Sequence, residues 1–123
     1  MKKILLIGIL FSLFTFNANA KYRQTCVVRY MTQQGWSKQY TVNVTFVSGN
    51  ELNTATNTFN YFSFSIYAII FWDEDQSSVI KLSTFLSCSN TVDESCIINT
   101  IGDLKGTDQK GDEWKICISD YCY

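Results

Sequence analysis

Carboxylates are the side chains of this sequence that could perform acid–base chemistry, because the 123 residues include no histidine. The lack of histidine excludes Ser-His-Asp and Cys-His catalysis and histidine-ligated metal sites. A carboxylate pair could still work as general acid and general base if one member were shielded, since shielding raises its pKa. The acids that could form such a pair are Asp73, Glu74, Asp75, Asp112 and Glu113.

Both groups of acids are better explained as parts of turns. Asp73, Glu74 and Asp75 separate two apolar segments, where charge keeps a hydrophobic hairpin soluble. Asp112 and Glu113 follow a turn sequence, and the alternating acids of a calcium-binding loop are absent there. We therefore predict no catalytic, cofactor-binding or metal-binding residues, with a small carboxylate-dependent hydrolase as the alternative.

Five cysteines provide the remaining reactive side chains, and their spacing favours disulfides over zinc because no C-x-x-C pair occurs. Short separations predict the pairs Cys88–Cys96 and Cys117–Cys122, which leaves Cys26 unpaired. A bridge from Cys26 to Cys117 is the main alternative. The odd cysteine is expected either to be buried as a free thiol or to join a second copy of the chain.

The first twenty residues predict export. An apolar run from Ile4 to Phe16 follows two lysines, and Ala18 and Ala20 form a small-x-small cleavage site. Thirteen apolar residues would rise only about 20 Å as a helix, too little to span a bilayer. We therefore expect a signal peptide at residues 1–20 and a single secreted β domain at residues 21–123, located in the periplasm or outside the cell, with no stable membrane span.

Charge is distributed unevenly, and it argues against a nucleic-acid partner. The charged residues from Lys21 to Asn50 are all positive, whereas all eleven acids lie from Glu51 onward. The expected mature chain is therefore acidic overall, unlike a general nucleic-acid-binding protein.

Alternation of apolar and polar residues predicts β-structure throughout. Strands are expected over Cys26 to Met31, Trp36 to Phe46, Tyr61 to Trp72, Val79 to Leu86, and Trp114 to Ser119, with turns at Gln33-Gln34-Gly35, Asp73 to Gln76 and Asp108 to Gly111. The polar stretch from Ser48 to Asn60 lacks helical periodicity and predicts a long loop. A short helical turn is expected over Thr91 to Ser95, followed by a strand containing Ile97, Ile98, Thr100 and Ile101.

The fold class that these elements predict is all-β and mainly antiparallel. About six strands and one short helical turn should form a small barrel or sandwich. Residues expected to be buried together are Trp36, Val42, Val44, Phe46, Phe64, Ile66, Ile70, Trp114 and Ile116.

Small size, export, disulfides and abundant aromatic residues favour a non-catalytic binding module, such as an inhibitor or an immunity-type protein. The expected partner is another protein of the cell envelope or exterior. Aromatic residues that could reach an interface are Tyr22, Tyr30, Trp36, Tyr61, Tyr67, Tyr121 and Tyr123.

Overall fold

Seven strands and two short helices make up the described part of the chain in the computed structural model, which covers residues 21–73, 75–84, 86, 88, 92–98 and 103–118. The elements in chain order are β1 (Lys21–Thr32), β2 (Gly35–Trp36), β3 (Tyr40–Ser48), α2 (Gly49–Thr56), β4 (Ile66–Asp73), β5 (Gln76–Leu82), α3 (Glu94–Ile98), β6 (Leu104–Thr107) and β7 (Glu113–Cys117). The expected signal peptide lies outside the described residues. Among those residues, no helix has the length and apolar character needed to cross a membrane.

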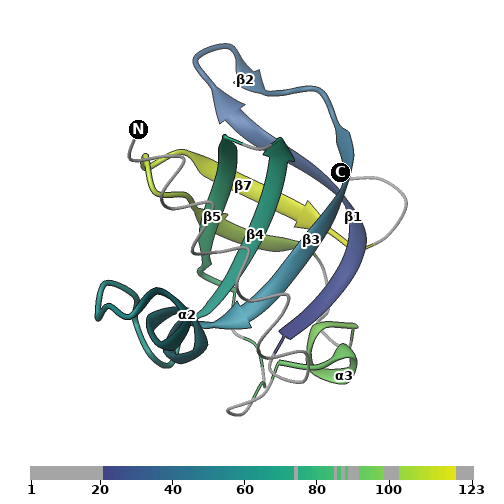
Figure 1. The fold of residues 1–123 in the computed structure, drawn as a ribbon. Helices are drawn as coiled ribbons and strands as arrows, with labels where there is room; N and C mark the ends of the chain where they lie inside the picture. The colour runs from purple at the N-terminus through teal and green to yellow at the C-terminus, as the bar shows by residue number, and fades with distance from the viewer. Residues whose placement is uncertain are drawn as a thin grey trace.

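Six of the strands close into an antiparallel barrel (Figure 1). The order is β1-β3-β4-β5-β6-β7, so successive barrel strands pair with one another, and pairing of the last strand, β7, with the first, β1, closes the barrel. Strand β1 can serve two partners because Val27 and Val28 pair with β3 on one side and with β7 on the other. Closure removes the unpaired edges of the sheet. The predicted all-β, antiparallel fold class is confirmed, and the architecture is a barrel.

The seventh strand, β2, is a two-residue extension outside the barrel. It pairs with the end of β1 through Met31↔Trp36 and Thr32↔Gly35. Gly35 has φ +108°, a backbone conformation that L side chains rarely adopt, so the turn needs glycine there. The predicted turn is confirmed. However, the strand expected from Trp36 to Phe46 is interrupted over residues 37–39, and Trp36 is only half-buried.

The barrel interior follows the expected alternation of side chains. Val44, Phe46, Ile66, Ile70, Trp114 and Ile116 are buried in one cluster, and Val42 packs against it partly exposed. Two members of the predicted core are wrong: Trp36 lies outside the barrel, and the side chain of Phe64 is 97% exposed. The reason for the second error is that β4 begins at Ile66, so the alternation read from Tyr61 includes residues that are not in a strand.

Helix α2 corrects the prediction of a long loop over Ser48 to Asn60. The Ser48 hydroxyl accepts a hydrogen bond from the backbone N–H of Glu51 at 3.1 Å, and Asn57 ends the helix in the left-handed conformation (φ 55°). Leu52 is fully buried in a second apolar cluster with Val47, Tyr67, Ile69 and Val79. This burial stabilises a helix whose Asn and Thr residues have low helix propensity.

Helix α3 also replaces part of a predicted strand. It is capped by Asp93, whose Oδ1 accepts hydrogen bonds from the Cys96 N–H at 3.0 Å and the Ser95 hydroxyl at 2.8 Å. Both hydrogen bonds lower the pKa of Asp93, and the bond from the Cys96 N–H has the larger effect. Ile97 belongs to the helix and is fully buried, so the strand is wrong at Ile97 and Ile98. Thr91 and the residues from Asn99 to Ile101 lie outside the described residues.

Helix α3 contributes to the closed end of the barrel. Val92 and Ile97 join the interior cluster together with Leu86, and the Cys88–Cys96 disulfide ties this segment to itself (S–S 2.00 Å). Figure 1 places α2 and α3 near the same end of the barrel, where β1 begins and β3 ends. The predicted Cys88–Cys96 bridge is confirmed. Apolar side chains from outside the sheet therefore fill this end.

Candidate functional site

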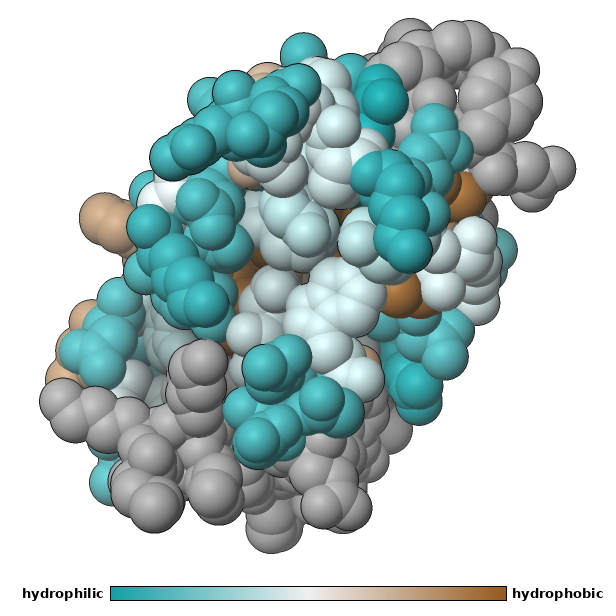
Figure 2. Space-filling model, turned by 90° about the horizontal axis from the view of Figure 1, so that it is seen from above, coloured by the Kyte–Doolittle hydropathy of each residue, from teal (hydrophilic) through white to brown (hydrophobic). Residues whose placement is uncertain are grey.

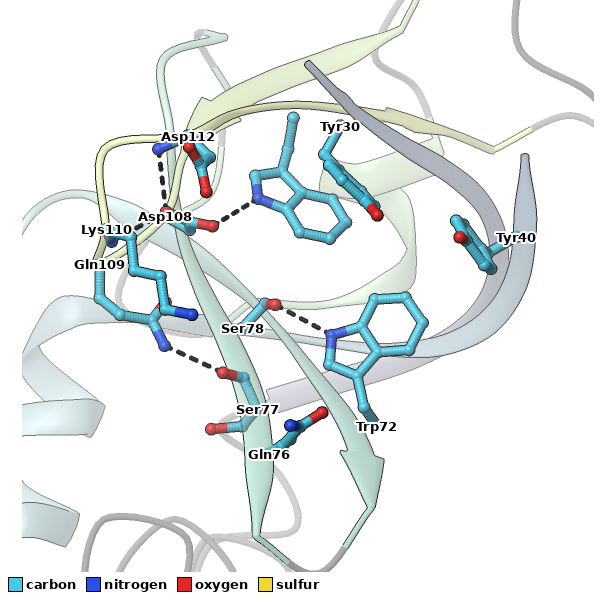
Figure 3. Close-up of a pocket in the computed structure, with 11 residues that line it drawn as sticks. Tyr30, Tyr40, Trp72, Gln76, Ser77, Ser78, Asp108, Gln109, Lys110 and Asp112 are labelled. Atoms are coloured by element: carbon cyan, nitrogen blue, oxygen red, sulfur yellow. Dashed lines mark hydrogen bonds between the residues drawn. The ribbon is translucent and has the colours of Figure 1, made fainter. Parts of the chain in front are cut away.

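The opposite end of the barrel, uppermost in Figure 1, holds a pocket of about 340 Å³ that we call the mouth pocket (Figure 3). It lies where β1, β4 and β6 end and where β3, β5 and β7 begin, and the β6–β7 turn forms part of its wall. The lining residues are Tyr30, Tyr40, Trp72, Gln76, Ser77, Ser78, Asp108, Gln109, Lys110, Asp112 and Trp114. In the view from above, residues of intermediate hydropathy lie at the centre of the face, with hydrophilic residues around them (Figure 2).

Four aromatic rings in mutual contact form the apolar part of the mouth pocket. Tyr30 lies 5.1 Å from Trp114 and 6.2 Å from Tyr40, measured between ring centroids. Trp72 lies 5.6 Å from Tyr40 and 6.1 Å from Trp114, so that each of the four rings contacts two others in a closed circuit. Trp114 is 5% exposed, whereas the other three rings are half-buried. Trp114 therefore forms the buried end of the pocket, and the other rings present surface to an incoming ligand.

Strand alternation explains why these rings converge. Each follows the interior-facing parity of its strand: Tyr30 continues from Val28, Tyr40 precedes Val42, and Trp114 precedes Ile116. Trp72 lies where the β4–β5 register shifts between Phe71 and Asp73, and such irregularities commonly re-aim a side chain. The rings are thus the last interior layer of the barrel at its open end.

Both indole N–H groups are anchored by polar side chains of the pocket. Trp72 Nε1 donates to the Ser78 hydroxyl at 2.9 Å, and Trp114 Nε1 donates to Asp108 Oδ2 at 2.8 Å. Buried indoles usually need such a partner, and here the partners also fix the ring orientations. The polar edges of both indoles are therefore already occupied within the protein.

The β6–β7 turn that carries Asp108 is itself firmly held. Asp108 Oδ1 accepts from the backbone N–H groups of Lys110 at 2.8 Å and Asp112 at 3.0 Å. Gly111 N–H donates to the Asp108 carbonyl at 3.0 Å, which confirms the predicted turn. Gln109 reaches across to β5, where it accepts from Val79 N–H and donates to the Ser77 carbonyl, both at 2.9 Å. The rim of the pocket is therefore preorganised.

The pKa of Tyr30 is raised, chiefly by a hydrogen bond with the neighbouring Tyr40 and by burial, while the charge of Lys38 opposes the shift and that of Asp112 adds to it. The Tyr30 phenol therefore stays neutral at physiological pH. Lys38 Nζ lies 5.1 Å from the centroid of the Tyr40 ring, which places one positive charge against the aromatic group.

The carboxylates considered for a catalytic pair belong to the β4–β5 turn and to the β6–β7 turn. Asp73 and Asp75 are exposed, as expected, and Glu74 lies outside the described residues. Hydrogen bonds from Asp75 lower the pKa of Asp73, the opposite of the shift that a general acid requires. Asp112 lines the mouth pocket, whereas Glu113 is exposed at the start of β7. No group of three potential metal ligands is found among the described residues.

Of the aromatic residues predicted for an interface, Tyr30 lines the mouth pocket. Tyr22 stacks on Phe46, and Tyr61 contacts Tyr67 beside α2. Tyr121 and Tyr123 lie outside the described residues. Tyr40 and Trp72 were not among the residues predicted for an interface, whereas Trp114 is buried as predicted and also lines the pocket. Tyr40 and Trp72 lie at strand ends, in the alternation of side chains that face the barrel interior, and this position is the signal that could have identified them.

Trp36 forms a separate cluster on the outside of the barrel. The Arg29 guanidinium carbon lies 5.6 Å and Lys115 Nζ lies 5.1 Å from the Trp36 ring centroids. Arg29 is paired directly with Lys115 across β1 and β7, and Lys115 with Lys105 across β7 and β6. The aromatic ring thus covers part of a row of positive residues, away from the mouth pocket.

Cys26 is the free cysteine of the described residues, as predicted. It lies in the barrel interior with 2% of its surface exposed, and burial raises the pKa of its thiol to about 12. Its position disfavours a disulfide to a second chain. Cys117 is disulfide-bonded, which excludes the alternative bridge to Cys26, whereas its predicted partner Cys122 lies outside the described residues.

Comparison with protein-family models, with curated proteins and with solved structures finds no match to this chain. Function must therefore be inferred from the chemistry of the mouth pocket.

Proposed function

We propose that this chain is a small secreted or periplasmic binding module, without catalytic activity of its own, that receives its ligand in the mouth pocket. The observation that carries the proposal is the circuit of four aromatic rings at the open end of the barrel. Ligand sites are typically concave and largely apolar, with a few oriented polar groups. The mouth pocket is concave and combines four aromatic rings with a polar rim whose side chains are partly held in place by hydrogen bonds.

Rigidity of the rim supports a binding role. The hydrogen bonds of Asp108, Gln109 and Ser78 hold two indoles and one turn in place before any ligand arrives. A site that is already ordered loses less conformational entropy when it binds. Aromatic residues in well-packed pockets also supply a large share of binding energy at protein interfaces.

Export is part of the proposal, and the disulfide supports it. Disulfides persist mainly in oxidising compartments, and the Cys88–Cys96 bridge fits the export that residues 1–20 predict. The partner we propose is a component of the envelope or exterior, either a protein or a molecule attached to one. An inhibitor or immunity-type role would follow if binding blocks the partner's own activity.

The carboxylate-dependent hydrolase receives no support from the pocket geometry. Asp108 is occupied by two backbone N–H groups and one indole N–H, so its oxygens serve the turn and Trp114. Asp73, whose pKa is lowered by hydrogen bonds, does not line the mouth pocket. Neither acid has the shielded environment of a general acid.

Capture of partners from envelope and culture-medium fractions tests the proposal. The wild-type chain, purified after export, should retain a partner that Trp72→Ala loses. Trp36→Ala is the matched control, because it removes a half-buried indole from outside the mouth pocket. Near-UV circular dichroism establishes that both variants are folded. Equal capture by all three chains, or loss of capture with Trp36→Ala alone, would place the binding site elsewhere.

A further inference from the structure

We infer that the group received by the mouth pocket is a neutral sugar ring. This inference rests on the proposed function and specifies the ligand of the same site. It depends on four features of the pocket, which are its size, its exposed aromatic faces, its mixed polar rim and its balance of charge.

The part of a ligand that enters the pocket has the size of one or two small rings. A volume of about 340 Å³ is near the lower end of the range of ~300–1,000 Å³ for small-molecule sites. No large space lies beneath it within the described barrel, because Val44, Phe46, Ile70 and Ile116 fill the interior. Long acyl chains and large planar cofactors therefore do not fit, whereas a sugar ring does.

The aromatic rings offer faces for stacking. Tyr30, Tyr40 and Trp72 are half-buried, and the Trp72 N–H is already used by Ser78. The faces of aromatic rings carry negative partial charge, and the C–H groups of a sugar carry positive partial charge. A pyranose can therefore place its C–H surface on these faces while its hydroxyls point to the rim.

The rim supplies both hydrogen-bond donors and acceptors. Gln76, Lys110 and Asp112 are exposed around the pocket, and Ser77 is half-buried beside them. These side chains include an amide, an ammonium, a carboxylate and a hydroxyl. A hydroxyl group donates and accepts, so a ligand with several hydroxyls can satisfy all of these chemical types at once.

The charges around the pocket favour a neutral ligand over an ion. The positive charges of Lys110 and of nearby Lys38, whose Nζ lies 5.1 Å from the centroid of the Tyr40 ring, balance the negative charges of Asp108 and Asp112. A cation attracted by the acids is repelled by the lysines, and the reverse holds for an anion, so neither gains a net attraction from the lining. A neutral ring with hydroxyls avoids both penalties, and it could come from a soluble saccharide or from a glycan of an envelope component.

An array of neutral, acidic and amino-sugar glycans tests the inference with the purified exported chain. We expect neutral glycans to bind, and we expect Trp72→Ala to weaken that binding at least ~10-fold while Trp36→Ala leaves it within about twofold. Gln76→Ala and Lys110→Ala provide a second test that does not disturb the core, because both side chains are exposed. These two changes together should weaken neutral-glycan binding measurably.

Competition identifies the source of the sugar. If soluble mono- and disaccharides from the bound class release the chain from the array, a free saccharide is sufficient. If only longer immobilised glycans bind, the source is an envelope glycan. Binding confined to acidic or amino-sugar glycans, or no neutral glycan bound, overturns the inference. If that happens while Trp72→Ala still abolishes partner capture, the proposed function stands; neutral-glycan binding that Trp72→Ala leaves unchanged would contradict both.

Discussion

The two ends of the barrel are built from the same strands but are finished in opposite ways. At one end Leu86, Val92 and Ile97 join the core from outside the sheet and leave it filled. At the other end the last interior layer consists of two Tyr and two Trp rings, and the indole N–H groups of the two Trp rings are anchored by Ser78 and Asp108. Aliphatic side chains complete a core, whereas anchored aromatic rings can be held in place and still face solvent. The difference separates an end that stabilises the fold from the end at which we propose that a ligand binds.

The largest effect on stability should come from the filled end. Ile97→Ala removes a fully buried side chain, so we expect the free energy of unfolding to fall by ~2–5 kcal/mol, measured by urea denaturation. Ile97→Val should lower it by only ~0.5–1.5 kcal/mol. Ligand binding by the folded fraction should be unchanged. If Ile97→Ala kept normal stability but bound ligand much more weakly, the assignment of stability to the filled end and of binding to the mouth pocket would be contradicted.

Substitutions of Asp108 should have a smaller effect on stability, and they should distinguish its role in anchoring Trp114 from its role in holding the β6–β7 turn. Asp108→Ala removes the acceptor of three hydrogen bonds, and we expect stability to fall by ~1–3 kcal/mol. Asp108→Asn can keep an oxygen for the turn while its amide nitrogen cannot accept from Trp114 Nε1. We therefore expect Asp108→Asn to weaken binding more than it lowers stability. Equal binding by wild type and Asp108→Asn would show that anchoring Trp114 is unimportant.

Much of this architecture could be predicted from the sequence, because alternation along β3, β4 and β7 directly specifies their inner faces. Helix α2 was missed although Ser48 and Glu51 form a capping pattern, since its Asn and Thr residues are poor helix formers and burial of Leu52 supports it. The mouth pocket could not be located in this way. Tyr40 and Trp114 look like core residues until the pairing of β1 with β7 closes the barrel and brings distant strand ends together.

A pH effect is expected from the barrel interior, between the two ends. Burial raises the pKa of Cys26 from 9.0 to about 12, so the folded state favours the protonated thiol. The resulting stability is fully present below pH 9 and is lost as the pH rises toward 12. Thermal unfolding should show this loss for the wild type and a weaker one for Cys26→Ala. A thiol reagent at pH 8 should label Cys26 only after unfolding; rapid labelling of the native chain would contradict its burial.

The smallest effects on stability and on binding are expected from the β4–β5 turn, whose acids belong neither to the filled end of the barrel nor to the aromatic rings of the mouth pocket. Replacing Asp73, Glu74 and Asp75 by Asn, Gln and Asn should change the free energy of unfolding by no more than ~0.5 kcal/mol, because Asp73 and Asp75 are exposed. Chemical denaturation and the capture experiment measure the two consequences. Loss of biological activity in a folded triple variant would instead assign a role to these acids.

The central claim, that the mouth pocket is the binding site, is tested most directly by nuclear magnetic resonance of the indole N–H groups. The chain has three tryptophans, of which Trp72 and Trp114 line the pocket and Trp36 lies outside it. Adding the partner or glycan recovered above should shift the Trp72 and Trp114 signals and leave the Trp36 signal in place. A shift of Trp36 with unchanged Trp72 and Trp114 signals would contradict the account.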